Sequence, residues 1–116
     1  MRKVVIAGAG VMGASLAQVY AKAGYHVSLW GRRQESLDKG RALIQLNQAT
    51  LVKEEMLIEA ESKRLTERIQ YTSDWECFAE PDVDLILESI VENLETKRSF
   101  WAEVSPMAPR HALLAT

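Results

Sequence analysis

The stretch that decides the fold is residues 3–13, which read KVVIAGAGVMG. Four strand-forming residues, 4–7, run directly into a glycine-rich turn. An apolar segment rich in small residues follows as far as Ala23, and Gly24 ends it in the position typical of a helix C-terminus. We therefore predict a strand, a tight turn and a helix.

The three glycines of this turn match the spacing of a dinucleotide-binding unit. Gly8 permits the sharp turn, Gly10 lets a ligand approach the backbone, and Gly13 lets the helix pack on the strand. The free N–H groups at the helix start then face a pyrophosphate, whose charge the helix dipole favours. The alternative is a glycine-rich turn that binds nothing, but such a turn rarely needs glycine at all three offsets.

Composition restricts the class of protein. The 116 residues predict one domain, 1–116, and 47% hydrophobic with 26% charged residues is ordinary for a globular protein. The net charge of −2, with both signs interspersed, gives no indication of a nucleic-acid or membrane surface. With one cysteine and two histidines we expect neither an internal disulfide nor a metal site.

No apolar run approaches the roughly 20 residues that span a bilayer. The basic start followed by apolar residues resembles a secretory signal only superficially, because glycines interrupt it and no convincing cleavage site follows. We therefore expect a cytoplasmic protein.

The rest of the chain alternates between strands and helices. Further strands are predicted at 26–30, 69–73, 83–88 and 112–115. Helices are predicted at 34–68 with a break near Val52 and Lys53, at 75–79, and from an Asn93 N-cap to Val104, with Pro106 and Pro109 ending the last one. This order predicts an α/β, Rossmann-like, doubly wound parallel sheet, with an extra helical pair after the second strand.

Helical periodicity predicts which helix faces are buried. In the first helix the expected sheet-facing stripe is Leu16, Val19, Tyr20 and Ala23. In the long polar segment the expected narrow face is Leu37, Ile44 and Leu51. In the last helix it is Leu94, Trp101 and Val104.

The residues that close the second strand bear on cofactor preference. An acidic residue there binds the ribose 2′-hydroxyl of NAD, but this chain has Gly31 followed by Arg32 and Arg33. Without the carboxylate a 2′-phosphate is not repelled, and two guanidinium groups can bind it. We predict a preference for NADPH. The alternative is that both arginines are solvated or pair with Glu35 or Asp38.

The segment after the fourth strand lies where a nicotinamide ring is expected. The Glu92 carboxylate can accept hydrogen bonds from the ribose or the carboxamide, and Lys97 can reach the same place. The alternatives are a helix N-terminal acid favoured by the dipole and a solvated lysine. His26 and His111 are expected on the surface and Cys77 in the core, so no catalytic residue is predicted.

Over its whole length the sequence resembles the N-terminal domain of 3-hydroxyacyl-CoA dehydrogenases, the group that includes 3-hydroxybutyryl-CoA dehydrogenase and lambda-crystallin. Residues 8–27 and 84–116 carry the resemblance, most specifically at 91–93, Lys97 and 113–116. It implies hydride transfer between a nicotinamide cofactor and C3 of an acyl-CoA. It also implies that Glu92 and Lys97 lie by the nicotinamide ribose and carboxamide. The pyrophosphate would be lined by Gly8, Gly10, Val11, Met12 and Gly13.

Two departures from the family pattern qualify this expectation. The family usually has Asp at the position of Gly31, so the cofactor is NAD or NADP, with NADPH favoured. The family also continues with an Asn-Thr-Ser-Ser run, a catalytic His, its partner Glu and a dimerising domain. We therefore expect the cofactor-binding part of an enzyme, which binds cofactor without turnover and whose oligomeric state depends on the missing part. The alternatives are an NADPH-linked reductase of a non-CoA hydroxy acid, and a non-enzymatic crystallin-like or nucleotide-sensing protein.

Overall fold

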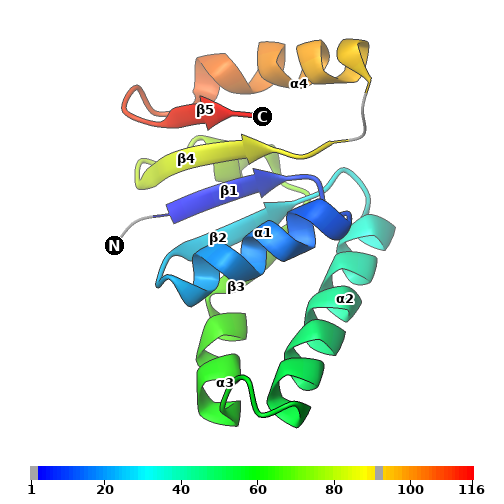
Figure 1. Ribbon diagram of the computed structural model, residues 1–116. Helices are drawn as coiled ribbons and strands as arrows, with labels where there is room; N and C mark the ends of the chain where they lie inside the picture. Colours follow the sequence, from blue (N-terminus) through cyan, green and yellow to red (C-terminus); the bar gives the residue numbers. More distant parts are fainter. Residues whose placement is uncertain (1–2, 91–92) are drawn as a thin grey trace.

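The computed structural model describes residues 3–90 and 93–116. Within them one parallel sheet has the strand order β3-β2-β1-β4-β5 (Figure 1). The strands are β1 Lys3–Ala7, β2 His26–Trp30, β3 Ile69–Thr72, β4 Val83–Glu88 and β5 Leu113–Ala115. The helices are α1 Val11–Lys22, α2 Gln34–Lys53, α3 Glu59–Glu67, the short 3-10 helix η1 Trp75–Phe78, and α4 Leu94–Met107. The predicted Rossmann-like fold is confirmed.

Strand β1 lies at the centre of the sheet and pairs with both β2 and β4. All five of its residues are buried because helices cover both faces, which explains its continuous apolar run. In the register Ala7 lies between Trp30 of β2 and Glu88 of β4. The carboxyl ends of these three strands therefore meet at one edge of the sheet.

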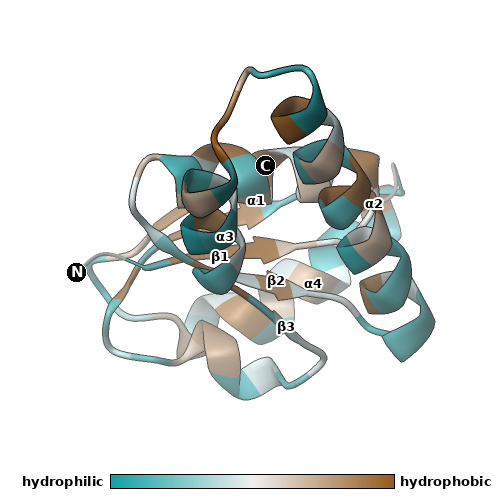
Figure 2. Ribbon diagram, turned by 90° about the horizontal axis from the view of Figure 1, so that it is seen from below, coloured by the Kyte–Doolittle hydropathy of each residue, from teal (hydrophilic) through white to brown (hydrophobic). Residues whose placement is uncertain are grey.

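Two cores lie on opposite faces of the sheet. Val4 and Ile6 of β1 face α1, α2 and α3, whereas Val5 and Ala7 face η1 and α4. Figure 2 shows the sheet between these two helical layers, with hydrophobic and hydrophilic segments alternating along α2. The helical pair α2–α3 extends beyond the sheet, as predicted (Figure 1). Gln48 joins its helices to α1, because it donates to Gln18 and accepts from Ser62.

The predicted buried stripe of α1 is partly wrong. Its buried residues are Gly13, Ala14, Ala17 and Ala21, whereas Val19 is 62% exposed, Ala23 is exposed, and Leu16 and Tyr20 are only partly buried. The buried face of α1 consists of small residues, and Gly13 contacts the turn so closely that no side chain fits there. Periodicity alone selected the larger residues on the neighbouring face.

In α4 the buried residues are Phe100 and Val104. Leu94, predicted to face inward, is 63% exposed, and Trp101 is partly buried. Pro106 lies inside the last turn and does not end the helix, which continues to Met107. A proline so close to the helix end removes only one late hydrogen bond, so the helix can include it and continue by one residue. In α2 Leu37 and Ile44 are buried as predicted, together with Gly40 and Gln48, and Leu51 is partly buried.

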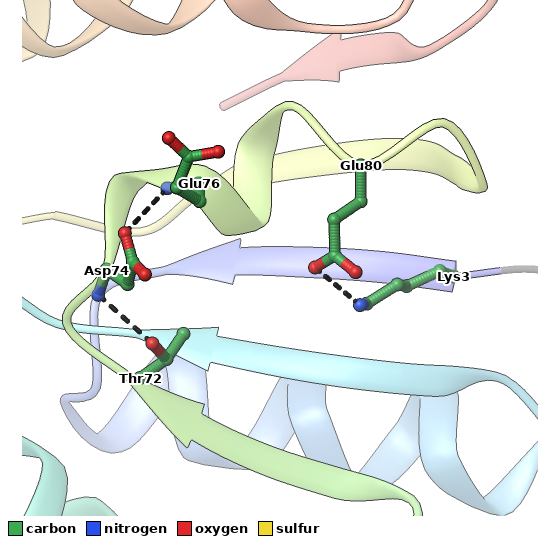
Figure 3. Close-up of polar contacts among 5 residues, drawn as sticks. All are labelled: Lys3, Thr72, Asp74, Glu76 and Glu80. Carbon is green, nitrogen blue, oxygen red and sulfur yellow. Dashed lines mark hydrogen bonds and ion pairs between the residues drawn. The ribbon is translucent and has the colours of Figure 1, made fainter.

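Polar contacts fix the segment that joins β3 to β4. Asp74 caps η1 by accepting a hydrogen bond from the backbone N–H of Glu76 at 3.0 Å, and its own N–H donates to Thr72 Oγ1 (Figure 3). At the other end of the sheet Lys3 Nζ lies 2.7 Å from Glu80 Oε1. Among the described residues no helix is long and apolar enough to cross a membrane.

Candidate functional site

The turn after β1 requires glycine at its first position. Gly8 has φ +115°, a conformation that side chains rarely adopt, and a Cβ there would lie 2.6 Å from the carbonyl oxygen of Ser89. Its N–H donates to the carbonyl of Trp30 at 2.8 Å. The turn is therefore fixed between the ends of β2 and β4.

Gly13 and Gly10 differ in what surrounds them. A Cβ on Gly13 would overlap the carbonyl oxygen of Gly8, so this glycine serves the contact between helix and turn. A Cβ on Gly10 would meet nothing within 4 Å. Packing inside the protein therefore does not require glycine at position 10. Open space at this position fits a ligand that approaches the backbone, as the pyrophosphate of a dinucleotide does.

The first turn of α1 is free to bind an anion. Its N-cap, Gly10, provides no side-chain hydrogen bond, and the turn contains no acidic residue. Val11 and Met12 are 73% and 65% exposed. Unpaired N–H groups at a helix start favour a phosphate, and the helix dipole adds to this preference.

A groove of about 420 Å³ runs from this turn along the carboxyl edge of the sheet. It joins the glycine turn to the start of α2 on one side and to the end of β4 on the other. Its lining residues are Gly8, Ala9, Gly10, Trp30, Arg32, Arg33, Ser36, Lys39, Ser89 and Ile90. Two larger grooves lie elsewhere on the described part of the chain. One of about 620 Å³ at the β3 edge contains none of the predicted site residues. The other, of about 670 Å³, lies along α4 and is lined by Lys97 together with Trp101 and Thr116.

Arg32 and Arg33 are exposed and line the groove, a position that fits both the NADPH prediction and the alternative of solvated arginines. The alternative pairing is not observed in the part of the chain that the structure describes. There Glu35 pairs with Lys39 at 3.3 Å, and Asp38 accepts a hydrogen bond from Gln34. The Arg32 guanidinium instead lies 6.0 Å from the centre of the Trp75 ring, within the range of a cation–π interaction.

Two groove residues escaped the sequence reasoning. Ser36 and Lys39 lie in the first turns of α2, immediately after the arginines, and line the same groove. Their positions on the predicted helix, three and six residues after Arg33, could have indicated that they lie near the arginines. Gly31 is buried, and a Cβ on it would lie 3.2 Å from Cδ2 of Leu37.

At the end of β4 the structure places Lys97 beside a buried carboxylate. Glu88 has a fully buried side chain, and its Oε1 lies 3.3 Å from Lys97 Nζ. Its Oε2 accepts a hydrogen bond of 2.6 Å from the backbone N–H of Ile90. Lys97 is thus not a solvated surface lysine, since its side chain is only 22% exposed. Glu92, the other residue predicted here, lies outside the described residues.

An aromatic cluster forms the floor beneath the groove. Trp30 contacts Trp75, Phe78 and Phe100, with ring centres 4.6, 5.3 and 5.8 Å apart. Trp30 Nε1 is buried and has no hydrogen-bond partner among the described residues. The ring therefore supports the groove by packing.

The remaining reactive side chains lie away from the groove. Cys77 is buried as predicted, and burial raises the pKa of its thiol to about 12, with the Glu80 carboxylate acting in the same direction. His26 is exposed, and His111 lies 3.2 Å from Asp84, near the amino end of β4. Within residues 3–90 and 93–116 no cluster of side chains suits a metal ion.

Comparison with known proteins decides the family. Residues 3–116 match the family described as "3-hydroxyacyl-CoA dehydrogenase, NAD binding domain". The chain belongs to this family. A probable 3-hydroxybutyryl-CoA dehydrogenase of Deinococcus radiodurans is 34% identical over 98% of the chain and 40% of its own length.

Solved structures of 3-hydroxyacyl-CoA dehydrogenases share the fold. The (S)-3-hydroxybutyryl-CoA dehydrogenase of Ralstonia eutropha has a TM-score of 0.92 at 25% identity, covering 99% of this chain and 40% of that one. A diketoreductase described as acting on dicarbonyl compounds has a TM-score of 0.88 at 25% identity, covering 100% and 41%. The chain thus spans about 40% of the length of these relatives and corresponds to the part that binds a nicotinamide cofactor.

Proposed function

We propose that this chain is the cofactor-binding domain of an enzyme that transfers hydride between a nicotinamide cofactor and C3 of a 3-hydroxyacyl- or 3-ketoacyl-CoA. The observation that carries the proposal is the open space at Gly10 beside the uncapped start of α1. A glycine that the protein's own packing does not require, next to free N–H groups, fits a bound pyrophosphate.

The proposal assigns each part of the groove to a part of the cofactor. The pyrophosphate lies on the backbone of residues 8–13, where Val11 and Met12 cover it with apolar side chains. The adenosine half lies toward the start of α2 and the nicotinamide half toward Glu92 and Lys97. When bound, the nicotinamide accepts or supplies the hydride. The residues of this chain bind and orient it, and no catalytic base is assigned among them.

The proposal includes a preference for NADPH over NADH. Arg32 and Arg33 line the adenosine end of the groove, and the neighbouring carboxylates of Glu35 and Asp38 have other partners. Gly31 presents no carboxylate that would repel a 2′-phosphate. Two exposed guanidinium groups beside an open groove suit a forked, charge-assisted contact with a phosphate.

Titration calorimetry on the 116-residue chain tests both parts of the proposal. We expect NADPH and NADH to bind, with NADPH tighter by about tenfold, as one charge-assisted contact supplies. Arg32→Ala should remove this advantage, and Arg64→Ala, an exposed arginine on α3, should not. If neither dinucleotide binds at millimolar concentration, the assignment of the groove fails. If both bind equally, only the NADPH preference fails.

A second candidate function is reduction of a non-CoA carbonyl compound. The similarity to the diketoreductase and the Gly31-Arg32-Arg33 turn favour it. Rates with 3-hydroxybutyryl-CoA, free 3-hydroxybutyrate and a diketone, measured on a full-length enzyme that contains this domain, separate the two. A preference for the CoA ester of at least about 100-fold is expected if the site binds the CoA group.

A further inference from the structure

Glu88 is an ionisable residue with a buried side chain, and the stability of the fold alone does not explain a carboxylate at this position. Its side chain is fully buried in the face of the sheet that carries the aromatic cluster. Removing a carboxylate from water is costly unless both oxygens find partners. Here Oε2 accepts a hydrogen bond from the Ile90 N–H, whereas Oε1 makes no hydrogen bond to the described residues and lies 3.3 Å from Lys97 Nζ.

The position of this pair follows from the strand register. Ala7 lies between Trp30 and Glu88, so the groove has a β2 side and a β4 side. Arg32 and Arg33 lie on the β2 side. A dinucleotide whose pyrophosphate crosses the turn after Ala7, and whose adenosine half lies by these arginines, directs its nicotinamide half toward Glu88 and Lys97.

We propose that Glu88 is a positioning residue that holds the Lys97 ammonium group beyond the β4 side of the groove, where the nicotinamide half of the dinucleotide would extend. The inference rests on the proposed function and extends it to a residue that does not line the groove. A lysine side chain is flexible, and a free one gives up rotational freedom whenever it binds a ligand. An ion pair with a buried, immobile carboxylate fixes its direction before the ligand arrives.

The two oxygens of Glu88 have different partners, so its effect on Lys97 can be separated from its effect on the loop after β4. In Glu88→Gln the amide oxygen can still accept from Ile90, so the loop after β4 keeps its hydrogen bond. The amide nitrogen then faces Lys97, and the ion pair is lost. The substitution therefore removes the ion pair of Lys97 with Glu88 at nearly constant volume.

The experiment measures dissociation constants for NADH and for ADP, which lacks both the nicotinamide ring and the ribose that carries it. In Glu88→Gln the affinity for NADH should fall about tenfold, as loss of one charge-assisted contact implies. The affinity for ADP should change less than twofold. The matched control is Glu80→Gln, which breaks the Lys3–Glu80 ion pair at the other edge of the sheet (Figure 3) and should leave both affinities unchanged.

An equal loss for both ligands, or no loss for NADH, overturns the inference. Because the comparison is made within one variant, a general loss of folded protein weakens both ligands alike and is recognised as such. A double variant tests whether Glu88 acts on NADH binding through Lys97. Glu88→Gln combined with Lys97→Met should bind NADH no more weakly than Lys97→Met alone. An additive loss contradicts the role of Lys97. If the unmodified chain binds neither ligand, the proposed function itself fails.

Discussion

The Cα of Gly13 lies so close to the carbonyl oxygen of Gly8 that a side chain on Gly13 would overlap it. This contact presses α1 against the turn after β1 and fixes where the first N–H groups of the helix point. Gly10, between the two, has open space where its side chain would be. The three glycines therefore separate into two that the fold requires and one, Gly10, that the packing of the protein does not require.

Substitution of Gly13 should mainly lower the stability of the fold, whereas substitution of Gly10 should mainly weaken dinucleotide binding. Gly13→Ala forces the helix and the turn apart and should lower the free energy of unfolding by about 3 kcal/mol. Gly10→Ala should cost less than about 1 kcal/mol, as expected at a helix N-cap, yet weaken dinucleotide binding about tenfold. Chemical denaturation and calorimetry on both variants measure this. A Gly10→Ala protein with full affinity would contradict a pyrophosphate at this position.

Gly31→Asp should reverse the cofactor preference. The new Cβ would lie 3.2 Å from Cδ2 of the buried Leu37, so the variant should fold if this side chain shifts by a few tenths of an ångström. Its carboxylate repels a 2′-phosphate and accepts a hydrogen bond from a 2′-hydroxyl. We expect the ratio of NADPH to NADH affinity to fall at least about tenfold. An unchanged ratio in a folded variant would show that this strand end does not meet the ribose.

Lys39→Ala tests whether the phosphate site extends into α2. We expect NADPH affinity to fall about threefold and to depend less steeply on salt concentration, because one cation of the groove is removed. NADH affinity should change little. Lys53→Ala, at the far end of the same helix, is the control. If Lys39→Ala and Lys53→Ala weaken NADPH binding equally, the loss comes from the overall charge of the protein and the phosphate site does not extend to Lys39.

Cys77 should make the protein less stable in alkaline solution. Its pKa rises from the ordinary value of 9.0 to about 12 in the folded chain, so the folded state holds the proton more tightly than the unfolded state. The resulting stabilisation is complete below pH 9 and is lost as the pH rises toward 12. Urea unfolding from pH 8 to 11 should show a shallower decline for Cys77→Ala. An equal decline of the free energy of unfolding with pH in the unmodified chain and in Cys77→Ala would contradict this prediction.

The chain alone should bind cofactor without turnover. Its described histidines lie away from the groove, and Cys77 is a buried neutral thiol. An assay of 3-hydroxybutyryl-CoA oxidation with the purified chain should therefore show no NADH or NADPH formation above background. Measurable turnover would show that a residue of this chain acts as the catalytic base.

The sequence predicted the strands, the glycine turn and the helical pair, because each depends on local backbone preferences. It misjudged packing faces, as with Val19 and Leu94, because periodicity does not report how closely a helix approaches the sheet. It did not predict the pair of Glu88 and Lys97, since only the fold brings β4 and α4 together and gives this carboxylate its partners. Ser36 and Lys39 were missed because the angle of α2 decides that they face the groove.

The aromatic floor of the groove has a practical consequence for measuring binding. Trp30 lines the groove and contacts Trp75, and both lie beside the proposed adenosine site. The emission of these indoles overlaps the absorption of a reduced nicotinamide. A bound NADH or NADPH should therefore quench the intrinsic fluorescence of the chain and emit in turn, so that occupancy can be followed optically without an attached dye.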